Sequence, residues 1–167
     1  MKSTNKILIG IVAGVILLVI IAFIVTLGQS LPSYQDETMP DSIAYNYLLA
    51  LRQNDYERAY GNLSPTLSGY PSDLDQFILD IEKRSWRFRQ NEDVSLAISS
   101  ASVNDQTATV RVKETRYYNY DLLRSLFGSN QSVRNFNVRL RRSNGTWKII
   151  NADYYWNSCW ERKDGCS

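Results

Sequence analysis

The stretch TATVRVKET, residues 107–115, decides the fold, because apolar and polar side chains alternate from Thr107 to Lys113. Ala108, Val110 and Val112 would lie on one face of a β-strand, with threonines and basic residues on the other. A period of two with one apolar face is typical of a strand in an antiparallel sheet. We therefore expect a half-buried strand here.

Strand patterns also flank this stretch. Residues 94–103 and 133–141 show similar alternation, and residues 146–156 are expected to form the last strand. Asn144-Gly145 is the strongest hairpin signal, since both turn positions need a positive φ. A short helical insertion is expected over residues 121–127.

Three helical patterns precede the strands. The first has a start signature at Thr38 to Asp41, the second begins at Asn54 and the third at Ser72. The apolar positions of the third helix follow helical spacing: Leu74, Phe77, Ile78 and Ile81. Helices in one block and strands in another predict an α+β fold with an antiparallel sheet.

Residues 7–27 read ILIGIVAGVILLVIIAFIVTL, with no charge and Thr26 alone polar. As a helix they would measure about 31 Å, which predicts a transmembrane helix. Lys2 and Lys6 precede this segment and no basic residue follows it until Arg52, so the N-terminus is expected in the cytoplasm. A cleaved signal peptide is the alternative.

The expected organisation is a cytoplasmic tail (1–6), the transmembrane helix (7–27), a linker (28–39) and an extracytoplasmic α+β domain (40–167). This arrangement predicts a single-pass protein of the cell membrane, with the lipid bilayer as a partner. Gly10 and Gly14 form a GxxxG pattern that permits close helix packing in a membrane. A membrane-protein partner or self-association through these glycines is therefore possible.

The run SIAYNYLLALRQNDYERAYGNLSP (42–65) resembles the opening of the nuclear transport factor 2-like superfamily, which includes ketosteroid isomerase-like proteins, as found in membrane-anchored bacterial members. The ending SNGTWKIINADYY (143–155) is similar to the closing hairpin of those domains. The resemblance implies a cone of three helices packed on a curved antiparallel sheet. It implies no single function, because that superfamily includes enzymes, carriers and structural modules.

Composition excludes several kinds of chemistry. The sequence contains no histidine, so histidine-dependent catalytic triads and histidine-ligated metal sites cannot form. Its 19 basic and 17 acidic residues differ only by Lys2 and Lys6, so the domain is neutral and no nucleic acid is expected as a partner. We expect no cofactor and no metal, and we assign no residue a catalytic role.

Aromatic residues crowd the ends of two strands. Tyr117, Tyr118, Tyr154 and Trp156 are the candidate ligand-binding residues, as the lining of an aromatic cleft. The same rings can instead fill the core. Asp80 and Asp153 are the carboxylates that a cavity enzyme would use, although the helical pattern favours a solvated Asp80.

Basic residues follow the polar side of two predicted strands. If those strands are neighbours, one sheet face carries Arg111, Lys113, Arg139 and Arg141. Such a face can dock an acidic partner or an anionic lipid surface, or it can simply be solvated.

Cys159 and Cys166 both follow the last predicted strand. Asp164-Gly165 can turn the chain between them, so we expect a disulfide; two free thiols in a frayed tail are the alternative. Together these features favour a non-catalytic binding or protein-interaction module. The alternatives are an accessory subunit of a membrane complex and a cavity enzyme acting on a small apolar substrate.

Overall fold

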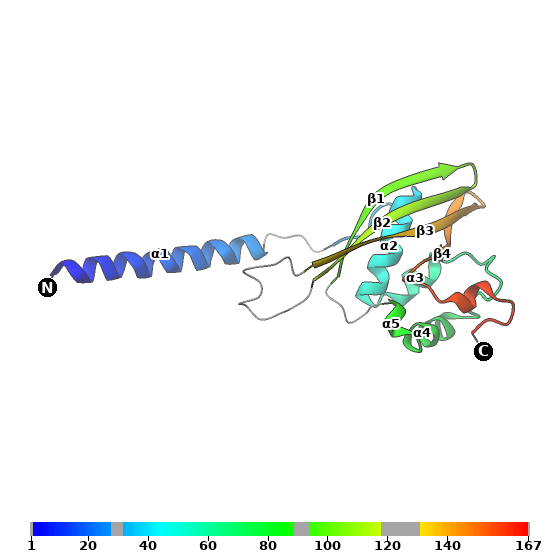
Figure 1. The fold of residues 1–167 in the computed structure, drawn as a ribbon, viewed down its shortest axis with the longest axis horizontal. Helices are drawn as coiled ribbons and strands as arrows, with labels where there is room; N and C mark the ends of the chain where they lie inside the picture. The colour runs from blue at the N-terminus through cyan, green and yellow to red at the C-terminus, as the bar shows by residue number, and fades with distance from the viewer. Residues whose placement is uncertain (1, 28–31, 89–93, 118–130, 167) are drawn as a thin grey trace. The chain divides into compact units, whose positions relative to one another are not determined.

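The computed structural model describes residues 2–27, 32–88, 94–117 and 131–166. The chain divides into two units, Met1–Ser33 and Tyr34–Ser167, and each is considered by itself. The second unit contains all four strands and every helix except the first (Figure 1).

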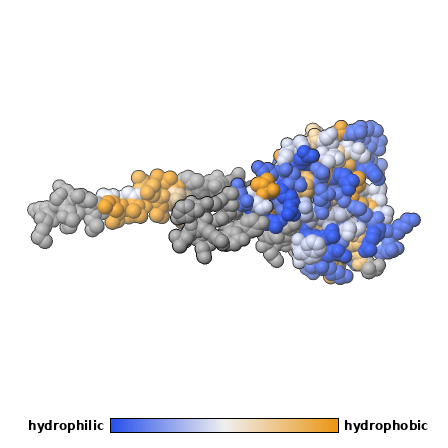
Figure 2. Space-filling model, in the orientation of Figure 1, coloured by the Kyte–Doolittle hydropathy of each residue, from blue (hydrophilic) through white to orange (hydrophobic). Residues whose placement is uncertain are grey.

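The first unit contains helix α1 (Lys2–Leu27), whose described side chains are exposed and mostly hydrophobic (Figure 2). Within the described residues, no helix is both long enough and apolar enough to cross a membrane. The predicted transmembrane helix at residues 7–27 is therefore wrong, as is the single-pass membrane localisation that rested on it.

The predicted α+β class and antiparallel sheet are confirmed. Four strands pair in the order β1-β2-β3-β4, each antiparallel to the next (Figure 1). They are β1 (Val94–Asn104), β2 (Thr107–Tyr117), β3 (Gln131–Ser143) and β4 (Thr146–Ala152). In the turn between β3 and β4, Asn144 and Gly145 both have positive φ, as the hairpin signal predicts.

The strand register places the apolar positions of β2 on the inner face. Val110 lies opposite Val138, and Val112 opposite Phe136, and all four side chains are buried. The register shifts between Ile98 and Ser100 in β1, and again between Arg139 and Leu140 in β3. Such irregularities bend and twist a sheet, which agrees with the expected curvature.

The helices pack on this inner face. Helix α2 (Pro40–Gln53) buries Ile43, Tyr47 and Leu51, and the Tyr47 hydroxyl donates to the Tyr155 carbonyl at 2.7 Å. The shorter helices are α3 (Tyr56–Gly61), α4 (Leu74–Glu82), α5 (Ser85–Phe88) and the 3₁₀ helix η1 (Ser158–Glu161). Helix α5 has no counterpart among the expected elements.

The predicted helix starts are each displaced by one residue. The N-cap positions are Met39, Asp55 and Asp73, rather than Thr38, Asn54 and Ser72. Asn54 instead ends α2 with a φ of 57°, and Asp55 then begins α3 by accepting from the Arg58 amide. The last strand ends at Ala152 rather than residue 156, and the predicted helix at 121–127 lies outside the described residues.

Part of the predicted linker belongs to the domain. Tyr34 donates its hydroxyl to Asp55 at 2.7 Å, and Glu37 pairs with Arg58 at 2.8 Å. The Gln35 backbone exchanges two hydrogen bonds of 2.8 Å with the buried side chain of Asn46. The second compact unit therefore includes the chain from Tyr34 onward.

Asp55 joins this N-terminal segment to α3. The stability that its carboxylate contributes should therefore depend on pH. The Tyr34 hydroxyl bond, aided by the Arg58 amide, holds the pKa of the Asp55 carboxyl below its usual range. A lowered carboxyl pKa adds stability above the unfolded value of about 4, and that stability is lost as pH falls through the folded pKa. Burial and this same bond raise the pKa of Tyr34 to about 12, so Tyr34 remains a donor at neutral pH.

We therefore predict that Asp55→Ala lowers the free energy of unfolding at pH 7 by about 1 kcal/mol, since it removes an N-cap. The loss should shrink as pH falls below about 4 and through the lowered pKa of the folded state, where the wild-type carboxylate becomes protonated. Denaturant titrations at several pH values measure this, with the exposed Asp36→Ala as the matched control. An equal loss at all pH values would contradict the assignment.

Candidate functional site

A cleft of about 320 Å³ lies between the α4–α5 segment and the C-terminal segment. Figure 1 shows α4 and the C-terminus at the same end of the domain. The lining residues come from these two parts of the chain: Asp80, Lys83, Arg84, Trp86, Asn157, Cys159, Arg162 and Cys166.

Asp80 is a buried carboxylate in this lining, with 1% of its surface exposed. It lies on the inner side of α4 because it follows Phe77 by three positions and precedes Ile81, and both of these side chains are buried. Gln76 Nε2 donates to Asp80 Oδ1 at 2.6 Å, and Trp160 Nε1 donates to Asp80 Oδ2 at 2.8 Å. Each carboxylate oxygen thus has a neutral donor, and the favoured solvated position of Asp80 is wrong.

Trp160 anchors the C-terminal segment. Its ring is fully buried and stacks on Phe77 with centroids 5.3 Å apart, while Phe88 and Trp156 contact it at 5.9 and 4.9 Å. Asn157 adds a second connection, because its Nδ2 donates to the Asp80 carbonyl oxygen at 3.2 Å and its Oδ1 accepts from the Cys159 amide. The segment is therefore fixed to α4 by both apolar and polar contacts.

Gly69 allows the same segment to approach the loop before α4. Its amide donates to the Trp160 carbonyl at 2.9 Å. A Cβ atom at this position would collide with the carbonyl oxygens of Cys159 and Arg162 and lie 2.9 Å from the Gly165 Cα atom. These are backbone atoms, so a side chain at position 69 requires the segment to move.

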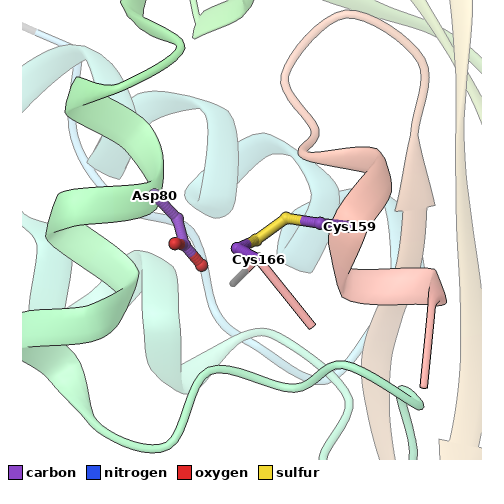
Figure 3. Close-up of side chains that lie close together, drawn as sticks. All are labelled: Asp80, Cys159 and Cys166. Carbon is purple, nitrogen blue, oxygen red and sulfur yellow. A yellow bond between two sulfur atoms is a disulfide. The ribbon is translucent and has the colours of Figure 1, made fainter. Parts of the chain in front are cut away.

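The predicted pairing of Cys159 with Cys166 is present as a disulfide, with Cα atoms 5.0 Å apart. Figure 3 shows Asp80 facing this pair from α4. One carboxylate oxygen and both sulfur atoms lie within 4.8 Å of one another. Sequence reasoning considered the cysteines alone and so did not identify this cluster.

The cleft is cationic on its outer parts. Lys83, Arg84 and Arg162 line it, and none of the ion pairs within the described chain involves them. Trp86, also in the lining, is 68% exposed, and the Arg87 guanidinium lies 5.0 Å from its ring centroid. The cleft therefore combines positive charge with an exposed aromatic ring.

Within the described residues, the predicted aromatic side chains have different surroundings. Tyr117 is half-exposed at the end of β2, and Tyr118 lies outside the described residues. Tyr154 packs edge-on against Phe136, with the Arg134 guanidinium over its ring at 4.7 Å. Trp156 is buried against Trp160 and donates to Glu161, so it belongs to the core around the C-terminal segment.

The other candidate residues are not among those that line the cleft. Asp153 is exposed after β4 and accepts from the Asn137 amide at 3.0 Å. Gly10 and Gly14 lie on α1, where the positions of their missing Cβ atoms have open space around them. Their packing against a second helix stays a prediction.

Glu114 is a buried carboxylate that sequence reasoning did not select. It is 1% exposed. Its carboxylate accepts a hydrogen bond from Arg116 at 3.0 Å and another from the Tyr155 hydroxyl at 3.4 Å. Burial raises the pKa of nearby Tyr47, whose hydroxyl bonds the Tyr155 carbonyl. The strand alternation already contains the signal, because Glu114 is the next inward position after Val112.

The basic sheet face is present, since β2 and β3 are neighbours. Arg111 and Lys113 lie opposite Asn137 and Asn135, and Arg139 and Arg141 lie opposite Thr109 and Thr107. All four cations are exposed, and each faces a neutral residue in the β2–β3 pairing, whereas Arg141 also lies opposite Lys148 of β4. This spacing reduces repulsion between them, as expected for a solvated sheet face.

No protein-family model and no curated protein matches the chain. Among solved structures, it is similar to a SEC-C motif-containing protein from Rhodopseudomonas palustris, with 13% identity, a TM-score of 0.47, and 71% and 80% of the two chains covered. It is also similar to an NTF2-like protein with a cystatin-like fold from Novosphingobium aromaticivorans, at 12% identity and a TM-score of 0.44, covering 67% of this chain and 75% of that one. A third is a protein of unknown function with a cystatin-like fold from Nostoc punctiforme. It is 15% identical, with a TM-score of 0.41, and the likeness covers 66% of this chain and 82% of that one.

Two of these structures are described as having a cystatin-like fold, and one of those two as NTF2-like. At such low identity the likeness concerns the arrangement of the chain, and no ligand or activity follows from it.

The close approach at Gly69 makes a testable prediction. Gly69→Ala should lower the free energy of unfolding by about 1–3 kcal/mol, because the new Cβ displaces the backbone of the C-terminal segment. Gly61→Ala is the matched control, since its Cβ meets open space and its backbone is not left-handed; it should be neutral or slightly stabilising. Equal unfolding midpoints for the two variants would show that the segment does not pack as described.

Proposed function

We propose that this chain is a non-catalytic protein-interaction module whose α4–α5 cleft holds an acidic segment of a partner protein. The observation that carries the proposal is the convergence of three cations from two parts of the chain on one concave site. Lys83 and Arg84 follow α4, whereas Arg162 comes from the C-terminal segment. Cations focused in a cleft attract carboxylates and speed their association.

Trp86 supplies the apolar part of the site. A tryptophan with 68% of its surface exposed is costly to leave in water, and tryptophan and arginine are the side chains that most often dominate binding energy at interfaces. Its neighbour Arg87 already lies over the ring at 5.0 Å. We infer that the partner segment places an apolar side chain on Trp86 and its acidic residues among the cations.

The interior of the domain supports a cavity enzyme less well. Glu114 is the carboxylate on the inner sheet face, and it already accepts from Arg116 and Tyr155. A catalytic carboxylate must be within reach of its substrate, and these bonds instead tie Glu114 to the surrounding core.

The proposal is tested with a fluorescent synthetic peptide in which glutamates flank one phenylalanine. Binding to the oxidised full-length chain is followed by fluorescence polarisation. Lys83→Glu and Arg84→Glu should each weaken binding about fivefold or more, and Trp86→Ala about tenfold. Binding should also weaken as the salt concentration rises.

Arg139→Glu is the matched control, because it makes the same charge reversal on the outer sheet face. It should leave peptide affinity unchanged. A peptide with lysines in place of the glutamates should not bind. Equal losses for Arg139→Glu and Lys83→Glu would mean that overall charge, and not the cleft, controls binding and would refute the proposal.

A further inference from the structure

The cleft floor brings together three side chains that can ligate a metal ion. They are Cys159, Cys166 and Asp80, and their candidate ligand atoms lie within 4.8 Å of one another (Figure 3). Two zinc–sulfur bonds of about 2.3 Å at a tetrahedral angle place sulfur atoms about 3.8 Å apart. In the oxidised chain the two sulfur atoms are bonded to each other, so an ion can bind only after reduction lets them separate to about this distance.

Asp80 is already oriented as a ligand. Gln76 donates to one carboxylate oxygen at 2.6 Å and Trp160 to the other at 2.8 Å. Each oxygen keeps a further lone pair, and hydrogen bonds of this kind orient metal-ligating carboxylates in proteins. Asp80 is also buried, which excludes most competing water from the carboxylate.

Contacts other than the disulfide hold Cys159 beside Asp80. Gly69 bonds the Trp160 carbonyl at 2.9 Å, Asn157 bonds the Asp80 carbonyl, and Trp160 is buried among Phe77, Phe88 and Trp156. These contacts hold the start of the C-terminal segment without involving sulfur. A reduced pair therefore retains Cys159 beside Asp80, with Cys166 seven positions further along the chain.

The charged residues around the cluster are compatible with a bound divalent metal ion. Two thiolates and one carboxylate carry three negative charges, of which a divalent cation neutralises two. The remaining negative charge lies in a cleft lined by Lys83, Arg84 and Arg162. These cations also favour formation of thiolates from the thiols.

The geometry points to a redox-gated metal site, in which reduction of the Cys159–Cys166 disulfide creates a centre for Zn²⁺ or a similar soft divalent cation. A dithiol or phosphine reductant supplies two electrons, and the disulfide becomes two thiols by taking up two protons. Metal binding then releases both thiol protons. Cys159, Cys166 and Asp80 are the ligands, and water from the cleft takes the fourth position.

The test is a Co²⁺ titration of the full-length chain, reduced with a phosphine and kept under argon. One equivalent should produce thiolate-to-cobalt charge-transfer absorption together with the visible bands of tetrahedral cobalt, and Zn²⁺ should then displace the cobalt. The oxidised chain should show neither absorption. Cys166→Ser should lose most of the charge-transfer intensity.

The Asp80→Asn variant distinguishes metal binding by all three ligands from binding by the two thiolates alone. The amide can still accept from Trp160 but is a poor metal ligand, so Co²⁺ affinity should fall at least about tenfold. Asp75→Asn, an exposed carboxylate on the same helix, is the matched control and should bind like the wild type. Circular dichroism of each reduced variant verifies folding.

Three results would overturn the inference: no charge-transfer band in the reduced wild type, equal binding by the oxidised chain, or equal affinity for Asp80→Asn and Asp75→Asn. If Asp80→Asn does not fold, Cys166→Ser decides, and unchanged absorption in that variant refutes the site. The peptide assay of the proposed function uses the oxidised chain. Failure of one proposal is therefore distinguishable from failure of the other.

Discussion

The hydrogen bond from Trp160 to the buried carboxylate of Asp80 is the interaction on which this end of the domain depends. Burying a carboxylate is costly unless donors compensate for the lost water, and a hydrogen bond to a charged group contributes about 1.5–3 kcal/mol. Here the donor is at the same time the largest fully buried side chain of the domain. One residue therefore fills the space between α4 and the C-terminal segment and also satisfies the carboxylate.

The cleft is a consequence of this connection. Once Trp160 is fixed, the chain beyond it must return along α4, and Gly69 leaves room for that return. Cys159 then lies beside Asp80, and Arg162 joins Lys83 and Arg84 in the lining. The proposed binding of an acidic segment and the inferred metal site both rest on this placement, although each uses different atoms.

Sequence patterns predicted the sheet well and the site poorly, for the same physical reason. Alternation along residues 107–115 identifies β2, because burial of one face is a property of many side chains together. Asp80 and Glu114 are buried too, yet the sequence favoured a solvated Asp80 and did not single out Glu114, since a carboxylate is rarely buried without donors. The donors, Trp160 and Tyr155, come from distant parts of the chain. The disulfide could be predicted because both cysteines are local, whereas the partnership of Asp80 with them depends on tertiary packing.

The most direct test of the Asp80–Trp160 connection is a double-mutant cycle on the free energy of unfolding, using Asp80→Ala, Trp160→Phe and the double variant. Each single variant removes the hydrogen bond, and Trp160→Phe retains an aromatic ring against Phe77. If the bond joins the two segments as described, the double variant should be more stable than the sum of the single losses predicts, with a coupling energy of about 1–2 kcal/mol. Additive losses within about 0.5 kcal/mol would contradict it.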